Sequence, residues 1–317
     1  MCEKKNYLPP LLVIAGPTAT GKSEMAVDVA GAIGGEVVSA DSMLVYRQMD
    51  IGTAKPTREA MRGITHHLID IVNPDEEYSV AVYQKQAREI IADIRARGGV
   101  PVLAGGTGLY IRSVIDRYDF TGACRDESLR LKLLNEARDN GFESLHQRLA
   151  EVDRQSAVKL HPRDVRRVIR ALEVYYLTGK PLSSYRKLEK RADPLYNLVF
   201  IGLTMAREKL YRRIEQRVEA MIEAGLVGEV QRLLNAGYSP GLTSMQGLGY
   251  KEIIAHLTGE VSLPEAVALL KRNTRRFAKR QLTWFRRDER IKWLEINPAE
   301  GLQTAAKEII SNIEGVF

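Results

Sequence analysis

Short apolar runs and helix-like apolar patterns alternate along the first third of the chain. The continuous runs predict buried strands at residues 11–15, 36–40, 67–71 and 100–104. Between them, apolar positions recur every three or four residues and predict helices over 23–33 and 79–97, each followed by a glycine pair. Because strands that alternate with helices form parallel sheets, this pattern predicts an α/β core in which helices flank a parallel sheet.

The pattern changes near residue 116. Residues 116–195 carry helical patterns rich in arginine and leucine, without strand-like runs, which predicts an all-helical insertion. Strand-like runs then return at 197–203 and 291–296, and the helical patterns between them cover 207–236 and 264–287. We therefore predict a core formed by residues 1–115 and 196–317, interrupted by an insertion domain of residues 116–195.

The composition is that of a soluble, folded protein. The 317 residues are 44% hydrophobic, which is ordinary for globular proteins, and the length predicts roughly two domains. The apolar run Leu11–Ala15 is far too short to span a bilayer, and no signal peptide precedes it. We expect a cytoplasmic protein without a membrane partner, and a monomer. Cys2 and Cys124 cannot by themselves supply a four-ligand zinc site.

The first strand leads into a phosphate-binding motif. The sequence Gly16-x-x-x-x-Gly21-Lys22-Ser23 matches the P-loop pattern, with a strand before it and a helix after it. In such a loop, backbone N–H groups and a helix N-terminus face an anion, the lysine adds a positive charge, and the serine hydroxyl can hold Mg²⁺. Any diphosphate or triphosphate could fit. The motif predicts a P-loop NTPase-like core with Ser23 as the Mg²⁺ ligand and phosphate binding by Gly16, Pro17, Thr18, Ala19, Thr20, Gly21, Lys22 and Ser23.

Polar residues follow several predicted strands, at the edge where ligands bind in open parallel sheets. Asp41 ends the second strand, and its carboxylate could accept a proton, help to hold Mg²⁺ through water, or cap the next helix. Asp70 resembles the acidic end of a Walker B strand, although its apolar run is short. Gly105-Gly106-Thr107 either frees the backbone for a ligand or forms a tight turn. The adjacent His66 and His67 would point to opposite faces of a strand, which indicates structural roles.

Residues 269–290, LLKRNTRRFAKRQLTWFRRDER, carry the strongest positive charge, within a chain of net charge +7. On a helix, Leu270, Phe277 and Trp284 recur every seven residues and predict a buried stripe. The exposed side would then carry Arg272, Arg275, Arg276, Lys279, Arg280 and Arg286. Because a solvated helix usually mixes both signs, we interpret this side as a contact with a phosphate backbone rather than an ordinary surface. A second basic cluster at 161–170 lies in the insertion, and two such surfaces favour a cleft that grips a folded polyanion.

Three arginines lie among apolar residues of the helical pattern at 207–221. A guanidinium binds oxyanions as a bidentate fork, so Arg212, Arg213 or Arg217 could complete a diphosphate site. Pairing with glutamates of the same helix is the alternative, and the spacing does not distinguish the three.

Six longer motifs resemble, in their order, those of the bacterial tRNA dimethylallyltransferase family: GPTATGKS, SADSMLVYRQMDIGTAKP, HHLIDIVNPDEEYSVAVY, AGGTGLY, QGLGYKE and TRRFAKRQLTWFRR. The P-loop alone is generic, whereas DSMLVYRQMDIGTAKP and AKRQLTWF are specific. The resemblance extends from about Pro9 to Trp293. It implies transfer of a dimethylallyl group from dimethylallyl diphosphate to N6 of adenine 37, in the anticodon stem-loop of tRNAs that read codons beginning with U.

The resemblance also implies roles for individual residues. The P-loop would hold the isoprenoid diphosphate, with Lys22 and Arg217 binding its charge and Ser23 binding Mg²⁺. Asp41 would be the general base toward the adenine amine, and Thr107 would line the channel where base and diphosphate meet. The implied tRNA contacts are Asp41, Ser42, Met43, Leu44, Val165, Arg166, Arg167, Val168, Ile169, Gln246, Arg275, Arg276, Lys279 and Arg280.

Other functions share some of these features. An ATP-dependent nucleoside or small-molecule kinase would use the same loop and sheet, but it would leave the arginine-rich helix unexplained. An RNA-binding NTPase switch without group transfer would need no base at Asp41. An enzyme that prenylates free adenine nucleotides would lie within the same reaction class.

Overall fold

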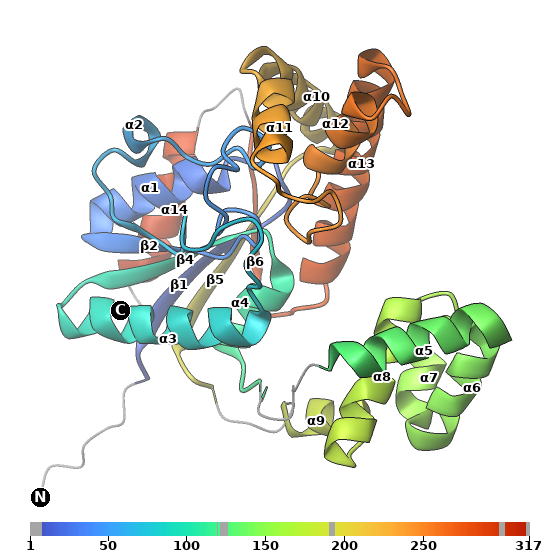
Figure 1. Ribbon diagram of the computed structural model, residues 1–317. Helices are drawn as coiled ribbons and strands as arrows, with labels where there is room; N and C mark the ends of the chain where they lie inside the picture. Colours follow the sequence, from blue (N-terminus) through green and yellow to red (C-terminus); the bar gives the residue numbers. More distant parts are fainter. Residues whose placement is uncertain (1–7, 119, 121–125, 190–193, 298–301, 315–317) are drawn as a thin grey trace, which may run out of the picture. The chain divides into compact units, whose positions relative to one another are not determined.

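In the computed structural model, residues 8–118, 120, 126–189, 194–297 and 302–314 are described. The chain divides into two compact units, one formed by residues 1–115 with 195–317 and the other by residues 116–194 (Figure 1). Cys2 and Cys124 lie outside the described residues. Among the helices that the structure describes, none has both the length and the apolar composition needed to cross a bilayer.

A fully parallel, six-stranded sheet forms the centre of the first unit, with the strand order β3-β2-β4-β1-β5-β6. The strands are β1 (Pro10–Ala15), β2 (Gly35–Ser39), β3 (His66–His67), β4 (Val100–Gly105), β5 (Asn197–Thr204) and β6 (Lys292–Glu295). In the register of the sheet, Ala15 at the end of β1 lies opposite Gly105 of β4 and Gly202 of β5. The P-loop therefore leaves the sheet between two neighbouring strands, and the predicted α/β core is confirmed.

The predicted strand at 67–71 is wrong beyond its first residue. Leu68 and Asp70 have φ angles of 62° and 56°, in the left-handed region that strands do not use. The chain therefore leaves the sheet after His67.

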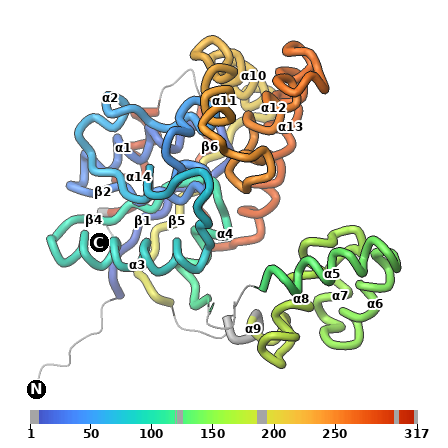
Figure 2. Tube along the Cα trace, in the orientation of Figure 1, coloured from blue at the N-terminus to red at the C-terminus, as the bar shows by residue number. Residues whose placement is uncertain are grey.

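Helices cover both faces of this sheet. The helices of this unit are α1 (Lys22–Ile33), α2 (Arg58–Met61), α3 (Val80–Ala96), α4 (Gly108–Ile115), α10 (Arg207–Glu223), α11 (Leu226–Asn235), α12 (Tyr250–Leu257), α13 (Leu263–Phe285) and α14 (Leu302–Glu314). Because side chains alternate along β1, Leu12 and Ile14 face the core beneath α1 and α14, whereas Leu11 and Val13 face α3 and α4. Figure 2 shows α14 beside α1, although the two helices lie at opposite ends of the sequence.

Helices α10 to α13 enclose a separate apolar core. Val218, Ile253 and Leu270 from three of these helices are buried there together with Met49, which comes from the segment after β2. The helical pattern predicted over 207–236 forms two helices, because α10 ends at Glu223 and α11 begins at Leu226. Gly225 between them adopts a φ of 94°, which breaks the helix.

The second unit contains helices and no strands among its described residues. Its helices are α5 (Glu127–Asn140), α6 (Phe142–Val152), α7 (Arg154–Lys159), α8 (Val165–Thr178) and α9 (Leu182–Glu189). Leu133, Leu149, Val168 and Leu172 form its own hydrophobic core. This insertion therefore has the apolar interior that an independent domain requires.

Candidate active site at the phosphate-binding loop

The turn between β1 and α1 has the geometry of an anion-binding loop. Gly16 has a φ of 147°, and a Cβ there would lie 2.5 Å from the carbonyl oxygen of Leu203. Only glycine fits this close approach to β5. Gly21 is the N-cap of α1 and provides no side-chain cap, so the first N–H groups of the helix remain available to an anion.

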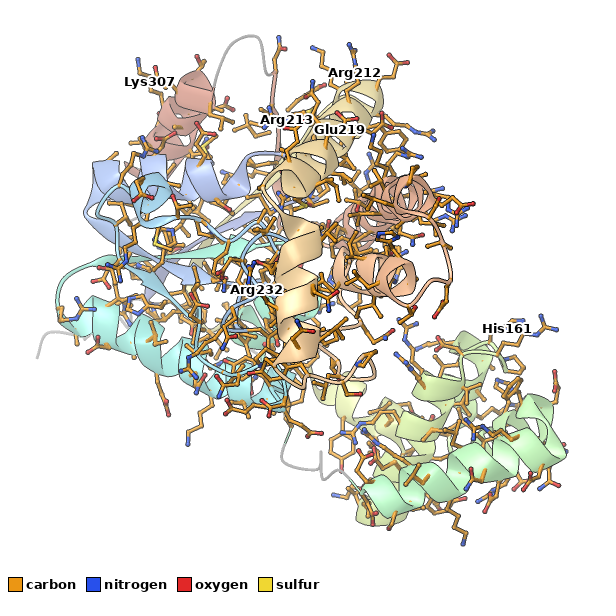
Figure 3. All side chains as sticks on the ribbon, turned by 45° about the horizontal axis from the view of Figure 1, so that its top comes forward. His161, Arg212, Arg213, Glu219, Arg232 and Lys307 are labelled. Atoms are coloured by element: carbon orange, nitrogen blue, oxygen red, sulfur yellow. The ribbon has the colours of Figure 1, made fainter. Side chains whose placement is uncertain are left out.

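Two distant helices hold this loop in place. Gln281 of α13 accepts a hydrogen bond from the Thr18 N–H at 2.9 Å and donates one to the Gly106 carbonyl at 2.9 Å. Arg213 of α10 donates to the Ala19 carbonyl at 2.9 Å. Figure 3 shows Arg213 beside Arg212 on α10, and Arg212 is exposed. Arg213 thus holds the loop through its backbone, and the choice of the arginine that completes a diphosphate site stays a prediction.

Lys22, Asp41 and Arg217 form the charged centre of the site. The Lys22 ammonium donates to the Pro17 carbonyl at 2.7 Å. Its burial lowers its pKa to about 8, an effect that the nearby Asp41 carboxylate opposes and the Arg217 charge reinforces. Burial also lowers the pKa of Arg217, and Asp41 again acts in the opposite direction. All three residues line the same cavity, so one carboxylate and two cations share one space.

Asp41 lies in the turn after β2, where Thr107 fixes the backbone. The Thr107 hydroxyl accepts a hydrogen bond from the Ser42 N–H at 3.0 Å, and the Thr107 N–H donates to the Ala40 carbonyl at 3.0 Å. One carboxylate oxygen of Asp41, Oδ1, accepts a bond from the Met43 N–H at 2.9 Å. Asp41 therefore caps a local turn, not the helix considered as the alternative, and its Oδ2 is not needed for that bond.

Two adjoining cavities open beside the loop. The larger, of about 820 Å³, is lined by residues that include Gly21, Arg62, Arg213 and Gln216. The smaller, of about 380 Å³, is lined by residues that include Asp41, Thr107, Gln246 and Arg280. Both cavities are lined by Lys22, Ser23, Ala54 and Arg217. The P-loop lysine and serine therefore stand where the two spaces meet.

The structure gathers most of the sequence-predicted residues of the core around the smaller cavity. It places Ser42, Met43 and Leu44 beside Asp41, while Gln246 comes from the loop before α12 and Arg280 from α13. Apolar side chains form part of the same lining: Val218, Met221, Leu248, Leu270 and Phe277. The smaller cavity thus combines a charged end at the P-loop with an apolar wall.

Helix α13 differs in part from the predicted pattern. Leu270 is buried and Phe277 half-buried, but Trp284 is 38% exposed, so the predicted stripe ends before it. Gln281 and Phe285 are buried at this end of the helix instead. Arg275 is half-buried and pairs with Glu215 of α10 at 2.5 Å, which corrects the expectation of an exposed side chain there. The other basic residues predicted to be exposed are so: Arg272, Arg276, Lys279, Arg280 and Arg286.

The second basic segment requires a similar correction. Val168 and Ile169 of α8 are 0% and 7% exposed within the core of the insertion. Their side chains are therefore covered in this packing, and the tRNA contact implied for residues 165–169 stays a prediction that would rest on the exposed members of the segment. Arg166 and Arg167 are exposed on the same helix, and His161 lies exposed shortly before it (Figure 3).

Asp70 and the histidine pair have structural partners. Asp70 forms an ion pair with Lys55 and does not line either cavity. His67 bonds Glu36 at 2.7 Å, and His66 bonds the Ile64 carbonyl at 2.9 Å, which confirms their structural roles. The described residues contain no cluster of three or more histidine, cysteine or acidic side chains that could hold a metal ion.

Sequence reasoning missed Gln281, although its position carried a signal. It is an uncharged polar residue on the apolar side of a strongly basic helix, four residues after Phe277. A buried amide there needs partners, and the P-loop and the Gly106 carbonyl supply them.

Comparisons with known proteins agree with this geometry. A family described as IPP transferase matches residues 44–288. A protein of Pelotomaculum thermopropionicum named tRNA dimethylallyltransferase is 59% identical over 99% of this chain and 100% of its own. A solved tRNA isopentenylpyrophosphate transferase of Bacillus halodurans is 44% identical, with a TM-score of 0.72 over 96% of each chain. A solved eukaryotic dimethylallyltransferase acting on tRNA is 30% identical, with a TM-score of 0.82 over 95% of this chain and 77% of its own.

Proposed function

Because the chain belongs to the IPP transferase family, we propose that it is a tRNA dimethylallyltransferase that acts in the cytoplasm. It transfers the dimethylallyl group of dimethylallyl diphosphate to N6 of adenine 37 in tRNAs that read codons beginning with U. The observation that carries this proposal is that Lys22, Arg217 and Asp41 all line the smaller cavity beside the P-loop. Lys22 and Arg217 supply positive charge for a departing diphosphate, and Asp41 supplies a base for an attacking amine.

The P-loop is suited to the leaving group. When the bond between C1 of the dimethylallyl group and its oxygen breaks, negative charge develops on the diphosphate. Lys22, Arg217 and the N–H groups at the start of α1 are fixed in advance around that position, so they stabilise the charge without reorganising. The apolar wall of the smaller cavity, which includes Val218 and Met221, provides a surface for the five-carbon chain.

Asp41 is suited to the acceptor. An adenine amine is a weak nucleophile, and it must lose a proton as its nitrogen bonds to C1. Asp41 Oδ2 can receive that proton while Oδ1 keeps its bond to Met43, so the turn survives the reaction. Because a stacked base cannot enter a cavity, the adenine is extruded from the anticodon loop, at a cost of about a few kcal/mol that the RNA contacts offset.

Ser23 fits a role as Mg²⁺ ligand. Its exposed hydroxyl lies at the N-terminus of α1 and lines both cavities. Mg²⁺ is commonly held by one or two protein oxygens together with substrate phosphates and water, so a larger acidic cluster is not required. When bound, the ion supplies additional charge stabilisation for the diphosphate.

The exposed side of α13 provides the tRNA contact in this proposal, and its salt dependence is testable. Replacing Arg276, Lys279 and Arg280 with alanine should weaken tRNA binding. The logarithm of the tRNA association constant falls as the logarithm of the salt concentration rises, and the variant should make this slope less steep by about 2 to 3. The reason is that each lost phosphate contact removes roughly 0.7–0.9 from its magnitude. Lys307→Ala on α14, another exposed cation (Figure 3), is the matched control. An unchanged slope in the triple variant would show that this face does not contact RNA.

The lowered pKa of Lys22 predicts how donor binding depends on pH. The free protein loses the Lys22 proton at about pH 8, whereas a bound diphosphate favours the charged form and raises that pKa. Affinity for dimethylallyl diphosphate should therefore fall as pH rises above about 8, by up to tenfold per pH unit. Calorimetry from pH 7 to about 10 measures this directly. Lys22→Arg, which stays charged, should remove the dependence; a flat profile for the unmodified protein would contradict the account.

One assay tests the proposed function against its rivals. The protein is incubated with labelled dimethylallyl diphosphate, Mg²⁺ and undermodified tRNA. Label should enter the RNA and, after digestion, be found on adenosine next to the anticodon. ATP-dependent phosphate transfer, or ATP hydrolysis without labelling, would instead support a kinase or an NTPase switch. Labelling of AMP but not of tRNA would identify a prenyltransferase for free nucleotides.

A further inference from the structure

The segment from Asp50 to Ala54 forms part of the wall of the proposed active site. Gly52, Thr53 and Ala54 line the smaller cavity, and Ala54 also lines the larger one. The carbonyl of Thr53 accepts a hydrogen bond from Nη2 of Arg217 at 3.3 Å. The position of this segment therefore affects the direction in which the Arg217 guanidinium points.

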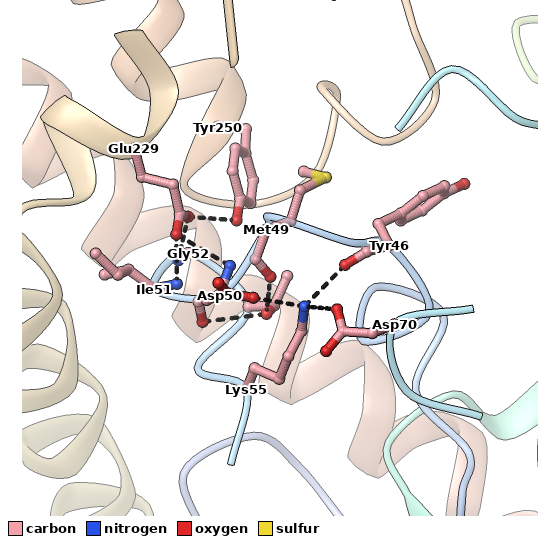
Figure 4. Close-up of polar contacts among 10 residues, drawn as sticks. Tyr46, Met49, Asp50, Ile51, Gly52, Lys55, Asp70, Glu229 and Tyr250 are labelled. Carbon is pink, nitrogen blue, oxygen red and sulfur yellow. Dashed lines mark hydrogen bonds and ion pairs between the residues drawn. The ribbon is translucent and has the colours of Figure 1, made fainter. Parts of the chain in front are cut away.

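A buried carboxylate from α11 holds this segment (Figure 4). Glu229 is 2% exposed and accepts hydrogen bonds from the N–H groups of Asp50, Ile51 and Gly52 at 3.0, 2.8 and 3.1 Å. Its Oε1 also accepts a bond from the Tyr250 hydroxyl at 2.7 Å. A carboxylate surrounded by four donors is well suited to gather successive backbone N–H groups and fix the turn that carries them.

Tyr250 contacts both the segment and the carboxylate that binds it. A Cβ on Gly52 would lie 2.6 Å from the Tyr250 ring, so the backbone and the ring meet only because residue 52 is glycine. Burial and the adjacent Glu229 raise the pKa of Tyr250, which keeps its hydroxyl protonated and able to donate. The Tyr250 ring thus packs against the segment, and its hydroxyl orients the carboxylate that binds the segment.

Lys55, which follows the segment, bonds back to its first residue. Its ammonium donates to the Tyr46 carbonyl at 2.8 Å, pairs with Asp50 at 2.6 Å and contacts Asp70, while its side chain is only 6% exposed. Residues 50–54 are therefore held between Glu229 on one side and Lys55 on the other, as Figure 4 shows. Neither of these two side chains lines either of the two cavities beside the P-loop.

We propose that Glu229 and Tyr250 are positioning residues for diphosphate binding, acting through residues 50–54 and Arg217. The inference rests on the proposed function only for the identity of the donor. A carboxylate that fixes three successive N–H groups keeps the Thr53 carbonyl beside Arg217, so the guanidinium is aimed at the P-loop before the donor arrives. Such prior orientation lowers the cost of binding and of reaching the reactive geometry.

Glu229→Gln tests this inference. In the variant, the glutamine NH₂ group would face backbone N–H or hydroxyl donors that a carboxylate oxygen now accepts. Because two donors cannot bond each other, residues 50–54 should be held less firmly. Calorimetric affinity for inorganic diphosphate should fall about tenfold, and KM for dimethylallyl diphosphate should rise by a similar factor, while affinity for tRNA stays unchanged. Glu223→Gln, an exposed glutamate at the end of α10, is the control. Tyr250→Phe is the second variant, for use if the glutamine variant does not fold. It removes one of the four donors and should lower diphosphate affinity by about threefold.

A double-mutant cycle separates positioning from a merely structural role. In an Arg217→Lys background, Glu229→Gln should cause little further loss of diphosphate affinity, because both changes act on the same contact. Wild-type diphosphate affinity in folded Glu229→Gln or Tyr250→Phe protein, or full additivity with Arg217→Lys, would overturn the inference. These binding measurements do not depend on RNA labelling, so failure of the unmodified protein to prenylate tRNA would overturn the proposed function alone.

Discussion

Replacing Asp41 with asparagine should lower the rate of prenyl transfer by about 10²–10⁴-fold, the usual contribution of a general base. The asparagine side-chain oxygen can still accept the Met43 N–H bond that Asp41 makes at 2.9 Å, so the turn after β2 should persist. The amide cannot take the proton of the adenine amine. A single-turnover labelling assay with saturating tRNA and donor measures the loss.

Binding assays identify the cause of that loss. The Asp41→Asn protein should bind tRNA and dimethylallyl diphosphate with affinities close to those of the unmodified protein. Asp75→Asn, at an exposed position, serves as the matched control and should keep full activity. A parallel loss of tRNA affinity and transfer rate in Asp41→Asn would instead assign Asp41 to RNA binding or to the local fold.

Lys22→Met should lower kcat/KM for dimethylallyl diphosphate by roughly 10²–10³-fold, the loss typical of removing one fixed group that stabilises developing charge. Methionine retains much of the length of the side chain but cannot neutralise a departing diphosphate. It also removes the bond to the Pro17 carbonyl, which lies within the loop. Steady-state kinetics with varied donor and fixed tRNA provide the measurement.

A variant on the surface controls for the loss of one positive charge. Lys85→Met on α3 removes an exposed lysine, and its kcat/KM should be unchanged. If Lys22→Met kept wild-type kcat/KM for the donor, the P-loop would not hold the leaving group. Donor chemistry would then have to be assigned to another part of the cavities.

The sequence predicted those parts of the fold that depend on local patterns. Buried runs such as Leu11–Ala15 and the motif from Gly16 to Ser23 carry their own signals, because strand burial and the loop geometry are encoded within a few residues. The strand predicted at 67–71 failed for a non-local reason: Lys55 pairs with Asp70, and Leu68 and Asp70 turn into the left-handed region. Trp284 was predicted to be buried because it continues the seven-residue spacing of Leu270 and Phe277. In the structure Trp284 is exposed, and Gln281 and Phe285 are buried instead.

The candidate site was predictable only in part for the same reason. Lys22 and Asp41 follow strands that the pattern located, and the sheet then brings them together. The residues that hold the site cannot be found by local reasoning, since Gln281 bonds Thr18 across 263 positions and Glu229 bonds Gly52 across 177. Such pairs are defined by how α11 and α13 pack on the core, which periodicity does not specify.

The most direct test of the account is a structure of the protein bound to an anticodon stem-loop RNA, Mg²⁺ and an unreactive thio-analogue of dimethylallyl diphosphate, prepared with ATP also present. We expect the diphosphate of the analogue in the loop from Gly16 to Ser23, contacted by Lys22, and the N6 atom of an extruded adenine facing Asp41. ATP alone in that loop, with its terminal phosphorus facing an acceptor hydroxyl, would contradict the account.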